Sequence, residues 1–204
     1  RGEGKVVVAS LGDVAASGAY WVAAQADRVV AAPGTLTGSI GVIMQVTNVR
    51  QLYEKLGISV EVIKSGPHKD MGAGLRPLTP EERRLFQRMV DDIYAQFVQV
   101  VAEGRRLPPE KVAALADGSL FTGRQALEVG LVDELGDYET AVRRARELAG
   151  LPPEAPVRSL VRPGLWQWFW SSMSAGRPAQ TPRLKPGLWL VAPALLPPGG
   201  EGGG

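Results

Sequence analysis

Short apolar segments alternate with longer amphipathic ones along the first 150 residues of the chain. Residues 4–11, 27–32 and 58–64 are short and rich in valine and isoleucine, which predicts buried β-strands. Residues 35–46 predict a glycine-rich loop that runs into a further strand. Helical patterns occupy most of the remaining segments: 16–26, 48–57, 80–103, 108–117, the first part of 122–136, and 137–150. This alternation predicts an α/β fold with a mostly parallel sheet and flanking helices.

The segment 80–103 predicts the longest helix. Thr79 and Glu82 have the spacing of a capping box, and Pro80 stands at the first helical position. Apolar side chains then recur at every fourth position: Leu85, Met89, Ile93, Phe97 and Val101. A stripe this wide predicts that the helix packs on another surface.

Charge and composition narrow the function classes. The 204 residues include 23 Lys plus Arg and 21 Asp plus Glu, and the basic residues are scattered, which argues against a nucleic-acid partner. The absence of cysteine excludes thiol and disulfide chemistry. The single histidine, His68, excludes a multi-histidine metal site, so we expect no metal and no other cofactor. No run of about 20 apolar residues exists, so no segment of this chain is expected to span a membrane.

The composition changes near Leu151. Ten of the 16 prolines and four of the five tryptophans lie from there to the end of the chain. We therefore predict a catalytic domain over residues 1–150 and a Pro/Gly/Trp-rich tail over 151–204 that is extended or partly disordered. The chain enters its first strand almost directly after Arg1, so we also expect a preceding segment to be missing.

Ser17 stands between Ala16 and Gly18, at the start of the nearly all-apolar segment 16–26. One interpretation is a helix N-cap, a common position for serine. The other is a nucleophile, because the N–H groups at a helix start stabilise developing negative charge and the N–H of Gly18 can contact an oxyanion. From this stretch alone, capping is the more frequent role.

A nucleophilic serine needs a base. His68 can form a triad with one of three carboxylates: Asp13, Asp27 or Asp70. Alternatively a neutral lysine can act, because burial is able to lower a lysine pKa from about 10.4 by about 3–5 units. Lys64 and Lys69 are the candidates, and periodicity does not choose between them. Ser39, in a glycine-rich stretch, is a hydroxyl that can orient such a lysine, or simply part of a turn.

Four segments together resemble the signal peptide peptidase A family, the serine-lysine membrane proteases with a ClpP/crotonase-like fold. They are GDVAASGAYWVAAQADRVVA, GTLTGSIGVI, LGISVEVIKSGPHKD and DGSLFTGRQALEVGLVDELG, in the order that the family has them. The resemblance covers about residues 4–150 and leaves only the tail outside.

The resemblance implies a role for individual residues. Ser17 matches the nucleophile and Lys69 the general base, whereas Lys64 matches a neighbour without an assigned role. Ser39 matches the serine that hydrogen-bonds the base, and Gly18 matches one oxyanion-hole donor. The chain departs from the family by having Ala19 where a second glycine is common, and it does not contain the upstream glycine-rich segment that supplies the other oxyanion donor.

The resemblance also implies partners and a location. It predicts a serine endopeptidase that hydrolyses remnant signal peptides or other apolar peptides through an acyl-enzyme. It further predicts a homo-oligomer with sites shared between protomers, and a membrane-associated protein whose catalytic domain lies on the extracytoplasmic side. The alternatives are a non-catalytic scaffold subunit of the same fold, which the missing upstream segment favours, or a crotonase-type acyl-CoA enzyme, which would rely on carboxylates instead of Ser17 and Lys69.

Overall fold

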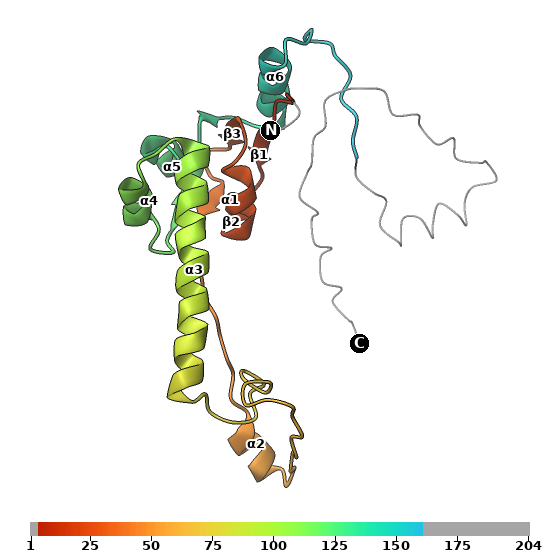
Figure 1. Ribbon diagram of the computed structural model, residues 1–204. Helices are drawn as coiled ribbons and strands as arrows, with labels where there is room; N and C mark the ends of the chain where they lie inside the picture. The colour runs from red at the N-terminus through yellow and green to blue at the C-terminus, as the bar shows by residue number, and fades with distance from the viewer. Residues whose placement is uncertain (1–3, 161–204) are drawn as a thin grey trace, which may run out of the picture.

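The computed structural model describes residues 4–160 and divides them between a packed core and a projecting arm. Figure 1 shows the strands and most helices gathered at one end of the long helix α3 (Pro80–Arg105). We call residues 42–79 the arm, because they run from the core along α3 to its far end and lead into its first turn. The arm contains one short helix, α2 (Arg50–Lys55).

The core contains two three-stranded sheets. In the first, β1 (Val8–Leu11), β3 (Arg28–Ala31) and β6 (Glu134–Leu135) are parallel, in the order β1-β3-β6. In the second, β4 (Leu36–Gly38) pairs parallel with β2 (Val14–Ala16) and antiparallel with β5 (Leu120–Thr122). The predicted α/β class with mainly parallel strands is confirmed.

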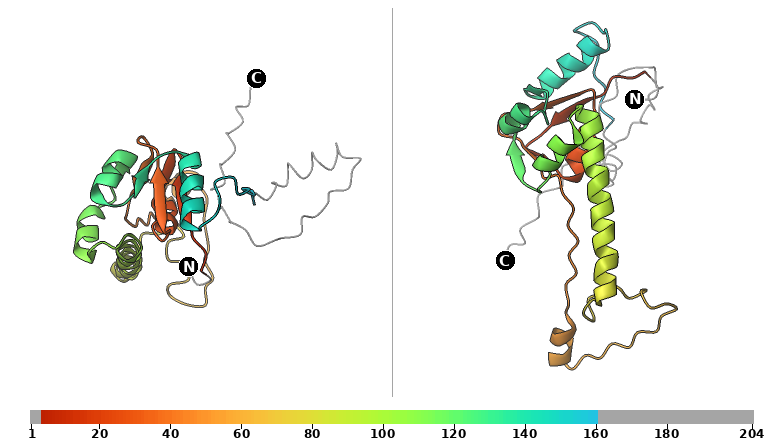
Figure 2. Two further views of the ribbon diagram at one scale, coloured as in Figure 1. Left: turned by 90° about the horizontal axis from the view of Figure 1, so that it is seen from above. Right: turned by 60° about the vertical axis from the view of Figure 1, so that its left-hand side comes forward.

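The remaining helices cover these sheets (Figure 2). Helix α1 (Gly18–Ala23) contacts β2 and α3, while α5 (Gly123–Val129) contacts β4, β5 and β6. Helix α4 (Pro109–Leu115) contacts α3, and α6 (Tyr138–Leu148) contacts β1 and β3. Among the described residues, none of these helices is long and apolar enough to cross a membrane.

The predicted start of α3 is confirmed, and the apolar stripe on it is only half buried. Thr79 Oγ1 accepts the backbone N–H of Glu82, and the Glu82 carboxylate accepts the backbone N–H of Thr79. Phe97 and Val101 are buried in the core, and the Phe97 ring lies 4.6 Å from that of Trp21 on α1. The stripe continues outward, where Met89 and Ile93 are exposed.

The predicted strand over residues 58–64 is wrong for the isolated chain. This segment lies in the arm, away from both sheets, and has no strand structure. Ile58, Val60 and Val62 are all exposed, and Ile63 is 94% exposed. A strand needs backbone partners on at least one side, and no strand within residues 4–160 pairs with this segment. The strand expected at the end of 35–46 is also wrong, because residues 39–46 have no strand structure and the strand of this region, β4, lies at its beginning and ends at Gly38.

The domain boundary predicted at Leu151 follows directly after α6. Gly150 adopts a positive φ of 64°, and the next residues turn back against the helix, where Arg146 donates two hydrogen bonds to the carbonyl of Ala155. The rest of the predicted tail, from residue 161 on, lies outside the described residues.

Candidate active site

The register of the second sheet brings Ser17 and Ser39 together. Ala16 at the end of β2 pairs with Gly38 at the end of β4, and the two strands are parallel. The residues that follow these ends therefore leave the sheet side by side, at a strand spacing of about 4.8 Å. Both serines line one cavity of about 430 Å³.

Ser17 has an unfavourable backbone conformation for a residue with a side chain. Its φ is 54° and its ψ is −121°, a combination favoured by glycine. Two hydrogen bonds hold it there, from the Ser17 N–H to the carbonyl of Gly38 at 2.8 Å and from the Trp21 N–H to the carbonyl of Ser17 at 2.9 Å. Backbone strain of this kind clusters at functional sites.

Ser17 stands at the N-cap position of α1, but its side chain makes no capping hydrogen bond to the helix, so capping does not account for its hydroxyl. The side chain is exposed and lines the cavity instead. Gly18 opens the helix, so its N–H has no acceptor one turn earlier within α1. A Cβ built on Gly18 would meet nothing within 4 Å, so there is open space on the side of Gly18 where a side chain would lie.

Ser39 is held in place by the loop that precedes β5. It also has a positive φ, 48°, and its N–H donates to the carbonyl of Ser119 at 2.8 Å. The preceding Gly38 has a φ of 76°, and a Cβ there would lie 2.6 Å from the ring of Phe121. Glycine is therefore required at this position, both for its backbone and for its lack of a side chain.

Two further polar side chains line the cavity, and neither was predicted. They are Tyr94, from the middle of α3, and Asp117, from the loop before β5. The hydroxyl and backbone N–H of Ser119 both donate to Asp117, and they lower the pKa of its carboxyl. Asp117 lies in the segment DGSL, but nothing in that pattern indicates a place beside Ser17.

Lys69, the predicted base, lies in the arm and not in this cavity. It belongs to the loop over residues 65–77, near the outer end of α3 (Figure 1), and its side chain is exposed. No lysine of the described residues lines the cavity of Ser17. A larger hollow of about 560 Å³ in the arm is lined by Lys64 and Asp70, but by neither serine.

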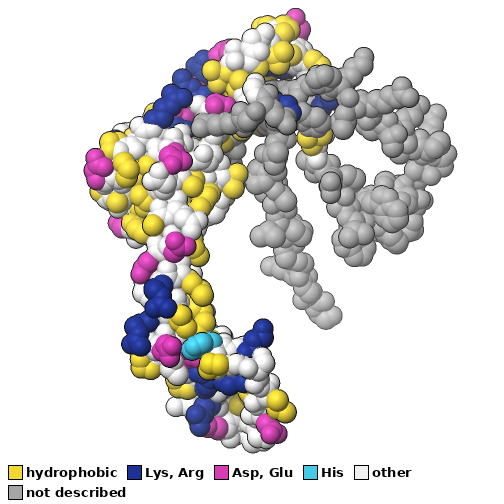
Figure 3. All heavy atoms as spheres, in the orientation of Figure 1, with side chains coloured by type: hydrophobic (Ala, Val, Ile, Leu, Met, Phe, Trp, Pro, Cys, Tyr) yellow, Lys and Arg dark blue, Asp and Glu magenta, His cyan; other side chains and the backbone are white. Residues whose placement is uncertain are grey.

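His68 is also remote from Ser17 within one chain. Its two ring nitrogens lie 3.9 Å from carboxylate oxygens of Glu81 and Glu82, at the start of α3. In Figure 3 the cyan histidine lies among the basic and acidic side chains of the arm. The alternative triad of Ser17 with His68 is therefore not formed within a single chain. Among residues 4–160, no cluster of three or more histidine or carboxylate side chains is arranged to hold a metal ion.

The fold and this cavity define a mixed α/β protein with a candidate serine nucleophile. The model of peptidase family S49 matches residues 1–152, and the chain belongs to this family. The resemblance to signal peptide peptidase A proteins is confirmed by relatives that carry that name, described next.

The chain is similar to several curated proteins over about three quarters of its length. It is 52% identical over 148 residues to "Putative protease slr0021" of Synechocystis, a match that covers 72% of this chain and 53% of that protein. It is 40% identical over 151 residues to "Serine protease SPPA, chloroplastic" of Arabidopsis thaliana, and this match covers 74% of this chain and 22% of that protein. It is 43% identical over 130 residues to "Putative signal peptide peptidase SppA" of Enterococcus faecium, and this match covers 64% of this chain and 38% of that protein. The chain thus spans about half, or less, of the length of these relatives.

A solved structure that the chain resembles is a putative enoyl-CoA hydratase/isomerase family protein from Hyphomonas neptunium. The TM-score is 0.36 at 22% sequence identity, and the match covers 72% of this chain and 38% of that one.

Proposed function

We propose that the chain is the catalytic part of a serine peptidase in which Ser17 is the nucleophile and Lys69 the general base. The observation that supports this most directly is the exposed, strained Ser17 beside Ser39 at one cavity, with no capping role for its hydroxyl. Ser17 Oγ attacks the peptide carbonyl and gives its proton to the neutral amine of Lys69. That amine passes the proton to the leaving amine, and water then hydrolyses the acyl ester.

The remaining parts of the site have supporting roles in this proposal. The N–H of Gly18 donates to the oxyanion, because Gly18 is the first residue of α1 and its N–H has no acceptor within the helix. Ser39 hydrogen-bonds the lysine amine and orients it. Family membership favours this chemistry over that of a crotonase-type acyl-CoA enzyme, in which the carboxylate of Asp117 would be the obvious acid-base group.

We infer that Lys69 reaches Ser17 from a second copy of the chain, so that each site contains residues of two protomers. Tyr94 lines the cavity and Glu82 lies beside the loop of Lys69, which places them about 18 Å apart along α3. A lysine side chain spans only about a third of that distance. The arm also exposes large apolar side chains, among them Ile43, Leu56 and Ile63, and contact with a second copy would bury such side chains.

A test of the nucleophile and base uses the full-length protein and an apolar peptide substrate. Ser17→Ala and Lys69→Ala are expected to abolish hydrolysis, and Ser17→Ala also to abolish labelling by a fluorophosphonate probe. Ser10→Ala, in β1, is the matched control and should retain both. If His68→Ala is inactive and Lys69→Ala active, the base assignment is wrong. A protein that neither cleaves nor labels would support the scaffold alternative.

A test of sharing between protomers mixes the two inactive variants. After subunit exchange, Ser17→Ala and Lys69→Ala protomers should together recover part of the activity, because some sites then combine an intact serine with an intact lysine. Exchange has to be verified by mass. No recovery after verified exchange would contradict a shared site, while leaving the roles of the two residues to the single variants.

We further propose that the substrates are apolar peptides such as remnant signal peptides, and that the protein works at a membrane with this domain on the extracytoplasmic side. The relatives named for signal peptide peptidase support the substrate class. Segments 165–170 and 187–196, which lie outside the described residues, contain tryptophan, a residue enriched at membrane interfaces. Flotation with liposomes should be weaker without residues 151–204, and equal binding would contradict a role for them.

A further inference from the structure

The loop that contains Lys69 has little regular structure of its own. Residues 65–77 form no helix or strand. Turns account for most of the loop's backbone hydrogen bonds, such as Lys69 N–H to the carbonyl of Gly66 at 3.2 Å and Met71 N–H to that of His68 at 3.0 Å, and one bond, from Val49 N–H to the carbonyl of Gly74 at 2.8 Å, joins the loop to the start of α2. Turns of this kind define the local chain path. They do not fix the loop against the helix that follows it.

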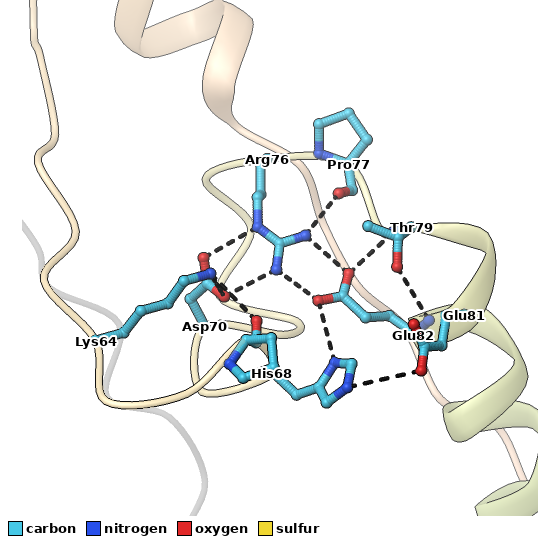
Figure 4. Close-up of polar contacts among 9 residues, drawn as sticks. Lys64, His68, Asp70, Arg76, Pro77, Thr79, Glu81 and Glu82 are labelled. Atoms are coloured by element: carbon cyan, nitrogen blue, oxygen red, sulfur yellow. Dashed lines mark hydrogen bonds and ion pairs between the residues drawn. The ribbon is translucent and has the colours of Figure 1, made fainter.

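The carboxylate of Asp70, the residue after Lys69, accepts hydrogen bonds on both of its oxygens (Figure 4). Lys64 Nζ donates to Oδ1 at 2.7 Å, and Arg76 donates from Nη2 to Oδ1 at 2.8 Å and from Nε to Oδ2 at 3.0 Å. The hydrogen bonds from Arg76, and then that from Lys64, hold the pKa of Asp70 well below its usual range. Asp70 is thus an ionised carboxylate whose charge two cations already match.

The same guanidinium is bound to the first turn of α3. Arg76 donates from Nη1 to Glu82 Oε2 at 2.7 Å and from Nη2 to Glu82 Oε1 at 2.5 Å, and Nη1 also donates to the carbonyl of Pro77 at 3.2 Å. The Glu82 side chain is only 2% exposed. It also accepts the backbone N–H of Thr79 in the capping box. Arg76 therefore connects a buried carboxylate of the helix with the residue next to Lys69.

We propose that Arg76 is a positioning residue that fixes the lysine loop to the start of α3 and matches the charge of Asp70, which leaves the Lys69 amine free to act in the cavity of Ser17. This rests on the proposed function of Lys69. The guanidinium is suited to the task because its planar fork binds two carboxylates at once, which a lysine ammonium does not reproduce. The other charged groups that face this cluster are Lys64, His68 and Glu81.

The test compares Arg76→Gln with Arg76→Lys in the full-length protein. Arg76→Gln should lower kcat about 10–100-fold with KM changed less than about twofold, because the base is misplaced after substrate has bound. It should also raise the midpoint of the acidic limb of the pH–rate profile by about 0.5 pH unit, since the charge of Asp70 is then less fully matched beside Lys69. Arg76→Lys keeps the positive charge but not the planar guanidinium. The midpoint of the acidic limb should therefore return to that of the unmodified protein, while kcat stays low.

Two further measurements distinguish a positioning role from a general loss of stability, and the first of them does not depend on catalytic activity. Hydrogen–deuterium exchange over residues 65–77 should become faster in Arg76→Gln but not in the control Arg50→Gln. Arg50 lines the same hollow and is exposed, but its ion pair is with Glu54 and not with Asp70 or Glu82. The double variant with Glu82→Gln avoids an unpaired buried carboxylate and should show the same kinetic change.

The outcomes separate this inference from the proposed function. If Lys69→Ala retains activity, the proposed function fails and the positioning role falls with it. If Lys69→Ala is inactive but Arg76→Gln retains the kcat, pH midpoint and exchange of the unmodified protein, the positioning role alone is overturned. A loss that appears only in KM, with an unchanged pH midpoint, overturns it as well.

Discussion

Replacing Ser17 by glycine removes the hydroxyl and also relieves the backbone at this position. The conformation at φ 54° and ψ −121° costs a residue with a Cβ about 1–3 kcal/mol, and glycine avoids that cost. Glycine also lowers the free energy of unfolding by about 0.4–1 kcal/mol relative to alanine, because it raises the conformational entropy of the unfolded chain. Ser17→Gly should therefore be more stable than Ser17→Ala by about 1 kcal/mol, although both variants lack the nucleophile. For a chain of 204 residues this corresponds to a Tm higher by about 2–4 °C.

The assay is thermal and urea unfolding of both variants, with Ser10→Gly and Ser10→Ala as a matched pair. Ser10 lies in β1 and is not among the described residues with a positive φ. At this position Ser10→Gly should instead be less stable than Ser10→Ala, by about 0.5–1 kcal/mol. If Ser17→Gly is also less stable than Ser17→Ala, the backbone at Ser17 is not strained, and the argument that strain marks this residue as functional fails.

Two further predictions concern the helix that supports the arm. A Cβ on Gly104 would lie 2.1 Å from the carbonyl oxygen of Ala24, so Gly104→Ala must push α3 from α1 by about 1 Å and should destabilise the protein by about 1–3 kcal/mol in urea unfolding. Gly34→Ala, where a Cβ meets nothing, should be nearly neutral, and equal effects would contradict the close approach. Separately, Arg76 and then the Thr79 N–H lower the pKa of Glu82 from 4.5 to about 2. The stability this provides is complete above about pH 5 and is lost as the pH falls through 2. Stability of Glu82→Gln, followed by urea unfolding from pH 7 to 2, should therefore depend less on pH, and parallel curves would contradict the assignment.

The helices could be predicted well because each has a long apolar pattern or a marked end. Thr79 and Glu82 form the predicted capping box, and Gly130 ends α5 in a left-handed conformation. The strands β2 and β5 were missed, since each has only three residues and a pattern that short has no period. The segment 58–64 has the composition of a strand, but a strand also depends on neighbours that the sequence does not reveal.

Only part of the site follows from local patterns. Ser17 and Ser39 could be singled out one by one, but their neighbourhood depends on the pairing of Ala16 with Gly38 across a parallel sheet. Tyr94 and Asp117 reach the cavity through tertiary packing. Arg76 could not be identified from the sequence, because neither it nor its two carboxylate partners follow a pattern that distinguishes them from other charged residues.

The rigid helix between Glu82 and Tyr94 constrains how the length of this chain can change. Loops tolerate insertions at a small entropic cost, because added residues leave their ends in place. A single residue inserted in α3 between these positions would instead rotate Glu82 by about 100° around the helix relative to Tyr94, and shift it by about 1.5 Å. Only insertions or deletions of whole turns would keep both residues on the same face, and each would move the lysine loop about 5.4 Å along the axis. We therefore expect length variation to be accommodated in the arm loops and excluded from this half of α3.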